Sequence, residues 1–389
     1  MRMKIDRHID SELKSHFNRY KEIIIIPGSR QSGKTTLVKR LFPDGRYLLA
    51  DNEPVRKFLE SYDANTYGSI LRDTEEIIII DEIHQLSDPG RAAKILHDEL
   101  KCRLIVTGSS SFHIRNRTAE SLAGRKIDYL LFPLTFSEYL FQAGLEESII
   151  YWPERYLENS DDTMNPKLYD FRFHLDNVLV YGLYPGMLNH PSDTRYLMNF
   201  VDSLVFKDII DFGLIENRRA GIDLLKLLAY QIGNMINYAE LSDKLQIDQR
   251  TVKRYIEIFE QSFILFRLYP FLGNRRDEIV KSPKIYFYDT GVRNAIVTDF
   301  SDMGLRPDTG RLFENFIISE FVKYNHYSGS GLILNYWRTK SGSEVDLVVQ
   351  NGKAVTAIEI KFNSGSISRA FANRFPGAQM RVLTAGNFF

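Results

Sequence analysis

Residues 28–35 read Gly-Ser-Arg-Gln-Ser-Gly-Lys-Thr, and Pro27 links them to four isoleucines at positions 23–26. This spacing fits G-x-x-x-x-G-K-[ST], in which the backbone N–H groups of a glycine-rich loop surround phosphate at the start of a helix. The pattern predicts that Lys34 reaches the phosphate oxygens of ATP and that the Thr35 hydroxyl binds Mg²⁺. The predicted ATP-binding residues are Gly28, Ser29, Arg30, Gln31, Ser32, Gly33, Lys34, Thr35 and Thr36.

A second motif lies at residues 77–82, which read Ile-Ile-Ile-Ile-Asp-Glu. An apolar run that ends in carboxylates is typical of a buried strand delivering an aspartate to a metal ion. We expect Asp81 to hold Mg²⁺ through water and Glu82 to orient or deprotonate the water that attacks the γ-phosphate. The alternative is an acidic pair that caps the following helix. His84 is interpreted as structural.

Between about residues 20 and 150, short β-branched runs alternate with helical stretches. The expected strands cover 22–26, 47–50, 76–80, 103–107 and 127–132. Such alternation predicts an α/β fold, a parallel sheet with helices on both faces.

Polar residues near the ends of two of these strands are further candidates for the ATP site. Ser109 or Ser110 follows the strand at 103–107, where a hydroxyl could sense the γ-phosphate, although a serine-rich turn has the same sequence. Arg125 precedes the last strand and could supply a charge to the nucleotide of a neighbouring subunit. The alternative for Arg125 is a surface arginine, so oligomerisation stays open.

Composition narrows the class of protein. The 389 residues predict two or three domains, and 44% apolar and 26% charged residues are ordinary for a globular protein. No apolar run reaches the ~20 residues of a membrane span, and no signal peptide precedes the charged start, so we expect a cytoplasmic protein without membrane contact. The single cysteine, Cys102, predicts a buried thiol. Fifty basic and fifty acidic residues balance, so any DNA contact requires a local patch.

Residues 28–37, 81–82, 107–111, 122–125 and 132–139 together resemble a prokaryotic AAA-type P-loop ATPase family. The resemblance spans about residues 1–150 and implies binding of ATP and Mg²⁺ by Lys34, Thr35, Asp81 and Glu82. Proteins of this family commonly continue into an uncharacterised C-terminal region, which the Gly-Leu-Tyr-Pro-Gly turn at 182–186 and the Glu-Ile-Lys at 359–361 also resemble.

The predicted organisation is a P-loop ATPase domain at 1–150, a helical linking region at 151–215, a winged-helix domain at 216–295 and a small α/β nuclease-like domain at 296–389. Helical patterns at 221–233, 238–246 and 249–263 precede strand patterns at 264–268 and 284–288. The DNA-facing candidates are Arg250, Lys253 and Arg254, with Asn274, Arg275 and Arg276 as a wing tip. The alternative is a lid or a contact with a protein partner.

Carboxylates gather near the C-terminus. If Asn351-Gly352 is a two-residue hairpin loop, residue 346 faces 357 and residue 344 faces 359. Glu344, Asp346, Glu359 and Lys361 then share one face, and Glu344 opposite Glu359 is destabilising unless a cation such as Mg²⁺ lies between them or Lys361 compensates. Asp346 with Glu359-x-Lys361 resembles the PD-(D/E)XK nuclease core, and Glu314 matches the acidic residue many members carry on the preceding helix. The alternative is a solvated hairpin face with a salt bridge.

Three functions remain open from the sequence. The first is an ATP-driven switch or motor for the C-terminal modules. The second is a metal-dependent DNA nuclease that ATP gates. The third is a non-catalytic interaction protein regulated by ATP binding.

Overall fold

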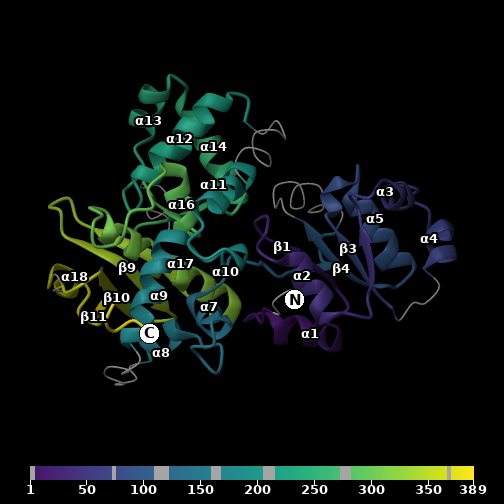
Figure 1. Ribbon diagram of the computed structural model, residues 1–389, viewed down its shortest axis with the longest axis horizontal. Coiled ribbons are helices and arrows are strands. Elements are labelled where there is room, and N and C mark those ends of the chain that lie inside the picture. The colour runs from purple at the N-terminus through teal and green to yellow at the C-terminus, as the bar shows by residue number, and fades with distance from the viewer. Residues whose placement is uncertain are drawn as a thin grey trace. The chain divides into compact units, whose positions relative to one another are not determined.

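The computed structural model describes residues 5–71, 76–108, 122–158, 168–204, 215–271, 282–365 and 369–389. The chain divides into two compact units (Figure 1). The first consists of Met1–Leu134, Gln142–Leu145 and Gln261–Phe263, and the second of Thr135–Phe141, Glu146–Glu260 and Ile264–Phe389. No helix in the described ranges is both long enough and apolar enough to cross a membrane.

The first unit is built on a five-stranded sheet in the order β2-β3-β4-β1-β5. Every pairing in it is parallel, as the alternating strand and helix patterns predicted. The strands are β1 (Ile23–Pro27), β2 (Arg46–Leu49), β3 (Ile77–Asp81), β4 (Arg103–Gly108) and β5 (Lys126–Asp128). The α/β prediction for this part of the chain is therefore confirmed, and only the last strand is markedly shorter than expected.

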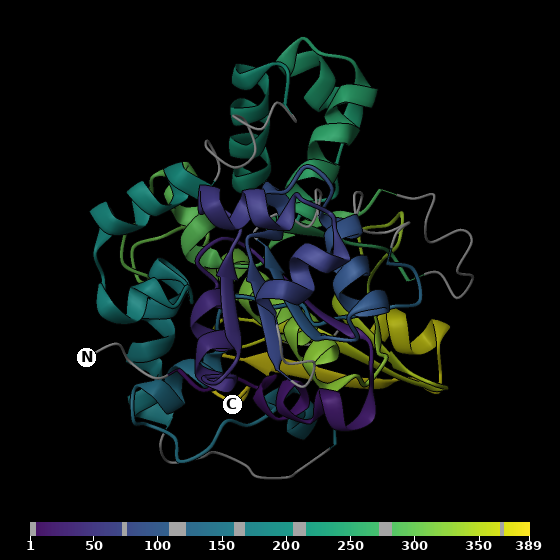
Figure 2. The same ribbon diagram turned by 90° about the vertical axis from the view of Figure 1, so that its right-hand side faces the viewer.

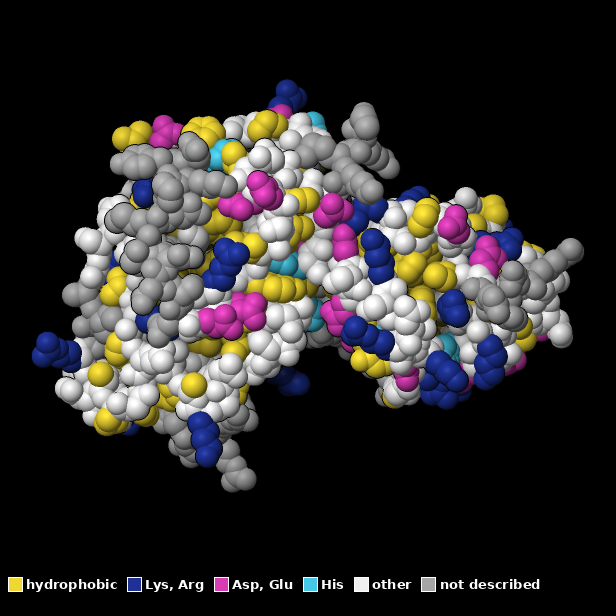
Figure 3. Space-filling model, turned by 90° about the horizontal axis from the view of Figure 1, so that it is seen from below, with side chains coloured by type: hydrophobic (Ala, Val, Ile, Leu, Met, Phe, Trp, Pro, Cys, Tyr) yellow, Lys and Arg dark blue, Asp and Glu magenta, His cyan; other side chains and the backbone are white. Residues whose placement is uncertain are grey.

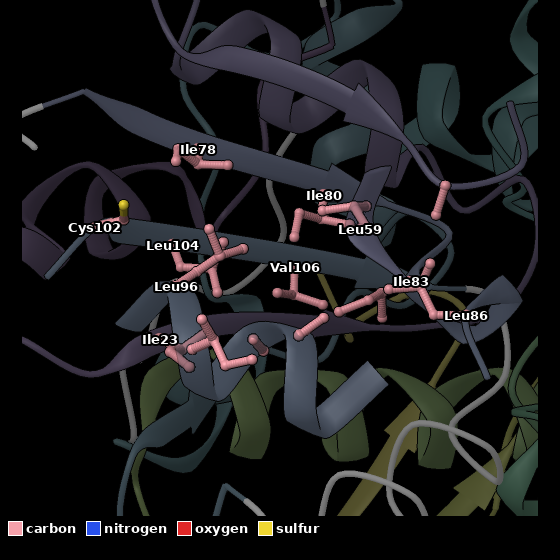
Figure 4. Packing of buried hydrophobic residues seen from close by; sticks show 14 of the residues in the cluster. Ile23, Leu59, Ile78, Ile80, Ile83, Leu86, Leu96, Cys102, Leu104 and Val106 are labelled. Atoms are coloured by element: carbon pink, nitrogen blue, oxygen red, sulfur yellow. The ribbon is translucent and has the colours of Figure 1, made fainter. Parts of the chain in front are cut away.

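Both faces of this sheet are buried, which explains the unbroken isoleucine runs. Alternate residues Ile78, Ile80, Leu104 and Val106 point into one core, shown in Figure 4, and the intervening Ile79 and Ile105 are also fully buried. Cys102 belongs to the same core, and its burial raises the pKa of the thiol. The predicted buried cysteine is confirmed.

Helices connect the strands of the first unit. They are α1 (Asp10–Arg19), α2 (Lys34–Leu41), α3 (Glu53–Leu59), α4 (Ala64–Ile70), the 3-10 turn η1 (Ile83–Gln85), α5 (Pro89–Lys94) and the π-helical turn η2 (Ile95–Glu99). Aspartate side chains cap two of them, because Asp63 accepts the N–H of Thr66 at the start of α4 and Asp88 accepts that of Arg91 at the start of α5.

The second unit begins with helices and a short hairpin. The helices are α7 (Phe136–Gln142), α8 (Trp152–Leu157), α9 (Leu168–Tyr181), α10 (Gly186–Asn189), α11 (Thr194–Asp202), α12 (Arg218–Tyr230), α13 (Tyr238–Leu245), α14 (Gln249–Gln261) and α16 (Thr290–Val297). The antiparallel hairpin pairs β6 (Leu265–Leu268) with β7 (Lys284–Phe287). The three helices and two strands expected between 221 and 288 are thus present within a few residues, and their interpretation as a winged helix stays a prediction.

The last part of the second unit is a mixed four-stranded sheet. Helix α17 (Thr309–Ser328) precedes β8 (Ile333–Arg338), β9 (Glu344–Asn351) and β10 (Ala354–Lys361), and α18 (Arg369–Arg374) leads to β11 (Gln379–Thr384). The strand order is β11-β10-β9-β8, with β11 parallel to β10 and the other pairs antiparallel. Helix α17 packs against β10 (Figure 2). The helix therefore faces the strand that carries Glu359 and Lys361.

The register of β9 and β10 differs from the prediction. Asn351 pairs with Ala354 and Leu347 pairs with Ile358, so the two loop residues are Gly352 and Lys353, with Gly352 at φ +59°. The expected pairing of residue 344 with 359 was wrong, because the loop lies one residue further along the chain. Since the shift moves each partner by two residues, the same side chains still share a face.

A close approach between α9 and the start of α16 requires glycine at position 182. Gly182 has φ +78°, and a Cβ there would overlap Oδ1 of the buried Asp289. The Asp289 carboxylate accepts the backbone N–H groups of Leu183 and Val292.

We expect Gly182→Ala to lower the free energy of unfolding by about 2–4 kcal/mol, because alanine is strained at this φ and displaces a carboxylate that satisfies two buried N–H groups. Both tryptophans, Trp152 and Trp337, are buried in the second unit, so urea unfolding followed by tryptophan fluorescence reports on it. Gly304→Ala is the matched control, since a Cβ at position 304 would have no atom within 4 Å. Equal midpoints for the two variants would contradict the prediction.

Candidate ATP site and the charged residues of the second unit

The loop at residues 28–33 has the backbone geometry that its glycines permit. Gly33 lies at φ +99° directly before α2, and Gln31 also has a positive φ of 58°. A Cβ on Gly28 would overlap the backbone oxygen of Leu131. Both glycines of the motif are therefore required by conformation or by space.

Lys34 is the first residue of α2 and its side chain is buried against the loop. Its ammonium donates to the backbone oxygens of Gly28 at 3.0 Å and Ser29 at 2.8 Å. The Ser29 hydroxyl is buried and has no hydrogen-bond partner among the described residues. The motif thus gathers an ammonium group and an unsatisfied hydroxyl where the sequence predicts phosphate.

Asp81 stands at the end of β3 and brings the two sequence motifs together. Its carboxylate accepts hydrogen bonds from the hydroxyls of Thr35, at 2.6 Å, of Tyr47 and of Thr107. Burial alone would raise the pKa of Asp81, but these hydroxyl donors hold it below its usual value. Asp81 is therefore an ionised carboxylate next to Thr35, as a magnesium site requires.

Tyr47 is a member of this site that the sequence analysis missed. It lies on β2, the strand paired with β3, and burial followed by its hydrogen bond to Asp81 raises the pKa of its hydroxyl. Lys39 from α2 lies 3.7 Å from the centre of the Tyr47 ring. No sequence motif marks a tyrosine on a strand such as β2. Only the pairing of β2 with β3 shows that Tyr47 lies beside Asp81.

Glu82 and His84 lie together beside Asp81. Glu82 is at φ 56°, its side chain is 27% exposed, and its Oε2 lies 3.2 Å from Nδ1 of the buried His84. The left-handed backbone turns the glutamate away from the line of β3. His84, interpreted as structural, therefore positions the carboxylate predicted to act on water.

Arg7 is a second residue without a sequence signal. Its guanidinium is buried and donates to the backbone oxygens of Ser32 at 3.0 Å and Phe132 at 2.7 Å. It therefore ties the phosphate loop to the segment that follows β5.

Arg125, another candidate of the first unit, does not join this site. Arg125 precedes β5 at the end of the sheet opposite to the loop, and its Nε lies 2.9 Å from Oδ2 of Asp98. Its role toward a neighbouring subunit stays a prediction. Ser109 and Ser110 lie outside the described residues.

The three basic candidates of α14 are all exposed. Arg254 is paired with Glu216 at 3.1 Å, and the Lys253 ammonium lies 5.2 Å from the centre of the Tyr238 ring. Arg250 and Lys253 are consequently the stronger members of the predicted DNA-facing set. The wing-tip residues Asn274, Arg275 and Arg276 lie outside the described part of the chain.

A buried lysine holds the carboxylates of the second unit apart. Lys284, on β7, has a side chain only 2% exposed, and its ammonium lies 3.3 Å from Glu314 and 2.5 Å from Glu344. Tyr286 donates its hydroxyl to the same Glu314 oxygen at 2.6 Å. Burial would lower the pKa of Lys284, but the charges of Glu314, Glu344 and Asp346 more than offset it and raise the pKa. Lys284, which the sequence analysis missed, thus lies between Glu314 and Glu344, whereas the pairing of Glu344 with Glu359, for which a cation was expected, is not formed.

Asp346, Glu359 and Lys361 form the adjacent part of the cluster. The Lys361 ammonium lies 3.3 Å from Asp346 and 2.8 Å from Glu359, and Asp346 also accepts the backbone N–H of Ile360. Burial, followed by the charge of Asp346, raises the pKa of Glu359. Burial also raises the pKa of Glu314, although the positive charge of Lys284 acts to lower it.

The sequence placed Glu314, Asp346, Glu359 and Lys361 in one candidate site. In the structure Lys284 lies between Glu314 and Glu344, and Lys361 lies between Asp346 and Glu359. Among the described residues, no group of three or more histidine, cysteine or acidic side chains is arranged to hold a metal ion. The structure therefore brings the predicted residues close together but does not present them as a metal centre.

Known proteins resemble this chain in parts. Residues 20–140 match the model of a family described as an AAA domain. Residues 172–304 and 309–379 match two models described as domains of unknown function, DUF8612 and DUF4143. The first match supports an AAA-type ATPase family and, in general, an ATP-binding ATPase.

Proteins similar along most of the chain are described as uncharacterized. The uncharacterized protein MJ1637 of Methanocaldococcus jannaschii is 25% identical over 373 residues, covering 90% of this chain and 76% of the relative. The uncharacterized protein Rv2008c of Mycobacterium tuberculosis is 24% identical over 372 residues, covering 93% and 75%. Among solved structures, the Walker-type ATPase PABY2304 of Pyrococcus abyssi has a TM-score of 0.48 at 14% identity, over 75% of this chain and 96% of that chain. The sequence similarity to the relatives thus extends over both units.

Proposed function

We propose that the protein is a Mg²⁺-dependent ATPase that acts as a switch for its second unit. The observation that carries this proposal is the 2.6 Å hydrogen bond between Thr35 and Asp81, which joins two motifs that lie 46 residues apart. A phosphate loop and an ionised aspartate in contact are the parts that ATP with Mg²⁺ requires.

The residues present fit this ligand. Lys34 and the unsatisfied hydroxyl of Ser29 lie in the loop expected to receive phosphate, and Thr35 with Asp81 supplies the oxygen ligands that Mg²⁺ prefers. Tyr47 and Thr107 orient the Asp81 carboxylate. Thr35 and Asp81 would hold Mg²⁺, which would neutralise the negative charge that develops on the phosphate during hydrolysis.

Hydrolysis needs a base for water, and Glu82 is the proposed one. Its carboxylate is partly exposed and follows Asp81 directly, while His84 holds one oxygen. In this role Glu82 accepts the proton of the attacking water. ATP hydrolysis would then reset the switch.

Hydrogen exchange of the full chain tests the switch. We expect ATP with Mg²⁺ to change backbone protection in the second unit relative to the nucleotide-free protein, because a switch needs two states that ATP binds unequally. Lys34→Ala is the control, and it should show no ATP-dependent change. Wild-type protein that binds ATP with unchanged exchange in the second unit would contradict the proposal.

One observation favours a second candidate, a metal-dependent DNA nuclease gated by ATP. Lys361 contacts both Asp346 and Glu359, the residues that resemble a PD-(D/E)XK core, and the order helix-strand-strand-strand-helix-strand of residues 309–384 suits that core. Incubating supercoiled DNA with Mg²⁺ or Mn²⁺ tests it. Cleavage that is absent from wild type, or that survives in Glu359→Ala, would exclude this candidate and leave the non-catalytic interaction role for these residues.

A further inference from the structure

A pocket of about 590 Å³ opens in the second unit where three segments meet. The turn before α13 and the start of α13 contribute Met235 and Tyr238, the segment after β6 contributes Pro270, and the end of β8 with the turn that follows it contributes Arg338 and Lys340. The backbones of these segments are joined, because Met235 bridges to Lys284 and Pro270 bridges to Tyr336. The pocket is therefore a built feature of the second unit.

The pocket lining has a positive charge. Among the described residues, its lining includes two cations, Arg338 and Lys340, and no carboxylate. Both cations are exposed. The Arg338 guanidinium lies 3.5 Å from Glu344, and the described part of the chain leaves most of its five donors to a ligand. Met235, Tyr238 and Pro270 supply apolar surface beside the cations. A lining of this kind suits a ligand that combines an anionic group with a flat apolar one.

Basic side chains of α14 lie beside the Tyr238 side of the pocket. Lys253 lies over the ring of Tyr238 at 5.2 Å, and Arg250 precedes it on the exposed side of α14. The molecular face shown in Figure 3 carries both basic and acidic side chains, so no single charge covers that face. Lys253 thus lies beside the pocket that Arg338 and Lys340 line, and Arg250 lies one turn earlier on the same helix.

We propose that the pocket seats the end of a single nucleic-acid strand. Arg338 and Lys340 bind its phosphate, Tyr238 and Met235 contact the unstacked base, and Arg250 and Lys253 follow the backbone onward. A single strand is favoured over a duplex because only an unstacked base can enter an apolar pocket. A nucleic-acid strand would then be the partner of the second unit. Only the view of that unit as the output of the ATP switch rests on the proposed function.

Fluorescence anisotropy with a short labelled oligothymidylate tests the proposal on the full chain. In Arg338→Ala/Lys340→Ala we expect the Kd to rise about ten-fold, because two charge-assisted phosphate contacts are lost. The slope of log K against log salt should fall in magnitude by about 1.4, because each phosphate contact to a single strand contributes about 0.7. Lys226→Ala/Lys353→Ala, which removes two exposed lysines elsewhere on the second unit, should leave the Kd unchanged.

Equal Kd values for wild type and Arg338→Ala/Lys340→Ala would overturn the proposal, as would an equal loss in the control variant. Tighter binding of blunt duplex DNA than of the single strand would also overturn it. Displacement of the probe by an acidic peptide as readily as by unlabelled oligothymidylate would assign the pocket to a protein partner instead.

Two further measurements keep the outcome unambiguous. If Arg338→Ala/Lys340→Ala fails to fold, photo-cross-linking of wild type with 4-thiothymidine at the strand end replaces it, and adducts should map to residues 235–238. Adducts confined to other segments would contradict the proposal. Lys34→Ala should bind the oligonucleotide normally while losing the ATP-dependent exchange, so failure of the ATP switch and failure of the pocket are distinguishable.

Discussion

Glu82→Gln should lower ATP turnover by about 10²–10⁴-fold, because a positioned general base contributes a factor of this size and glutamine cannot accept the proton. The side chains have nearly the same shape, so the contact with His84 and the backbone at φ 56° should persist. Affinity for ATP should stay within a few-fold of wild type, since Lys34, Thr35 and Asp81 are unchanged. Phosphate release in single-turnover experiments measures the chemical step, and equilibrium binding of a labelled nucleotide measures the affinity.

Two matched variants separate this role from simple loss of charge near the site. Glu60→Gln removes another carboxylate of the first unit, which accepts two hydrogen bonds from Ser87 and belongs to neither sequence motif. This variant should keep wild-type turnover. Asp81→Asn should weaken the dependence on Mg²⁺, which Glu82→Gln should not. Equal turnover in wild type and Glu82→Gln would exclude Glu82 as the base, and the acidic pair would then be a strand-ending structural feature.

Lys284→Met should lower the free energy of unfolding of the second unit by about 3–5 kcal/mol, because it leaves two carboxylates without the cation between them. Glu314 is 14% exposed and is also bound by Tyr286, so it cannot easily turn to water. Urea unfolding followed by the fluorescence of Trp152 and Trp337 measures the loss, since both report on this unit.

The exposed Lys340→Met is the control for lysine loss and should change the free energy of unfolding by less than about 0.5 kcal/mol. Adding Glu314→Gln to Lys284→Met should recover part of the lost stability, because the uncompensated buried charge is then removed. The coupling between the two positions follows from the double-mutant cycle. Additive effects of Lys284→Met and Glu314→Gln would show that Lys284 stabilises the unit without this ion pair.

The ATP site shows how far local patterns carry. Gly28, Gly33, Lys34 and Thr35 lie within one loop and the start of one helix, so their spacing along the chain is also their spacing in space. Asp81 could be added because an isoleucine run that ends in a carboxylate predicts a buried parallel strand whose end reaches the same edge of the sheet. Tyr47, Arg7 and His84 carry no such pattern and entered the site through strand order and packing.

The hairpin of β9 and β10 shows the opposite case. The dipeptide Asn351-Gly352 is a strong turn signal, yet the pairing places Gly352 and Lys353 in the loop. Alternation still assigned the faces correctly, because a shift of two residues preserves them. The predicted cross-strand partners were wrong. Glu344 therefore does not face Glu359, and the repulsion predicted for that pair does not arise.

Residue order alone determined the parallel sheet of the first unit, the phosphate loop, the Asp81–Glu82 pair and the shared face of Asp346, Glu359 and Lys361, since each depends on local spacing. The tertiary structure determined what surrounds those groups. Lys284, from a strand 60 residues before Glu344, neutralises the carboxylates, and Arg338 and Lys340 meet Tyr238 at one pocket. The physical reason is that ion pairs and pockets act over a few ångströms in space, and sequence distance does not measure that separation.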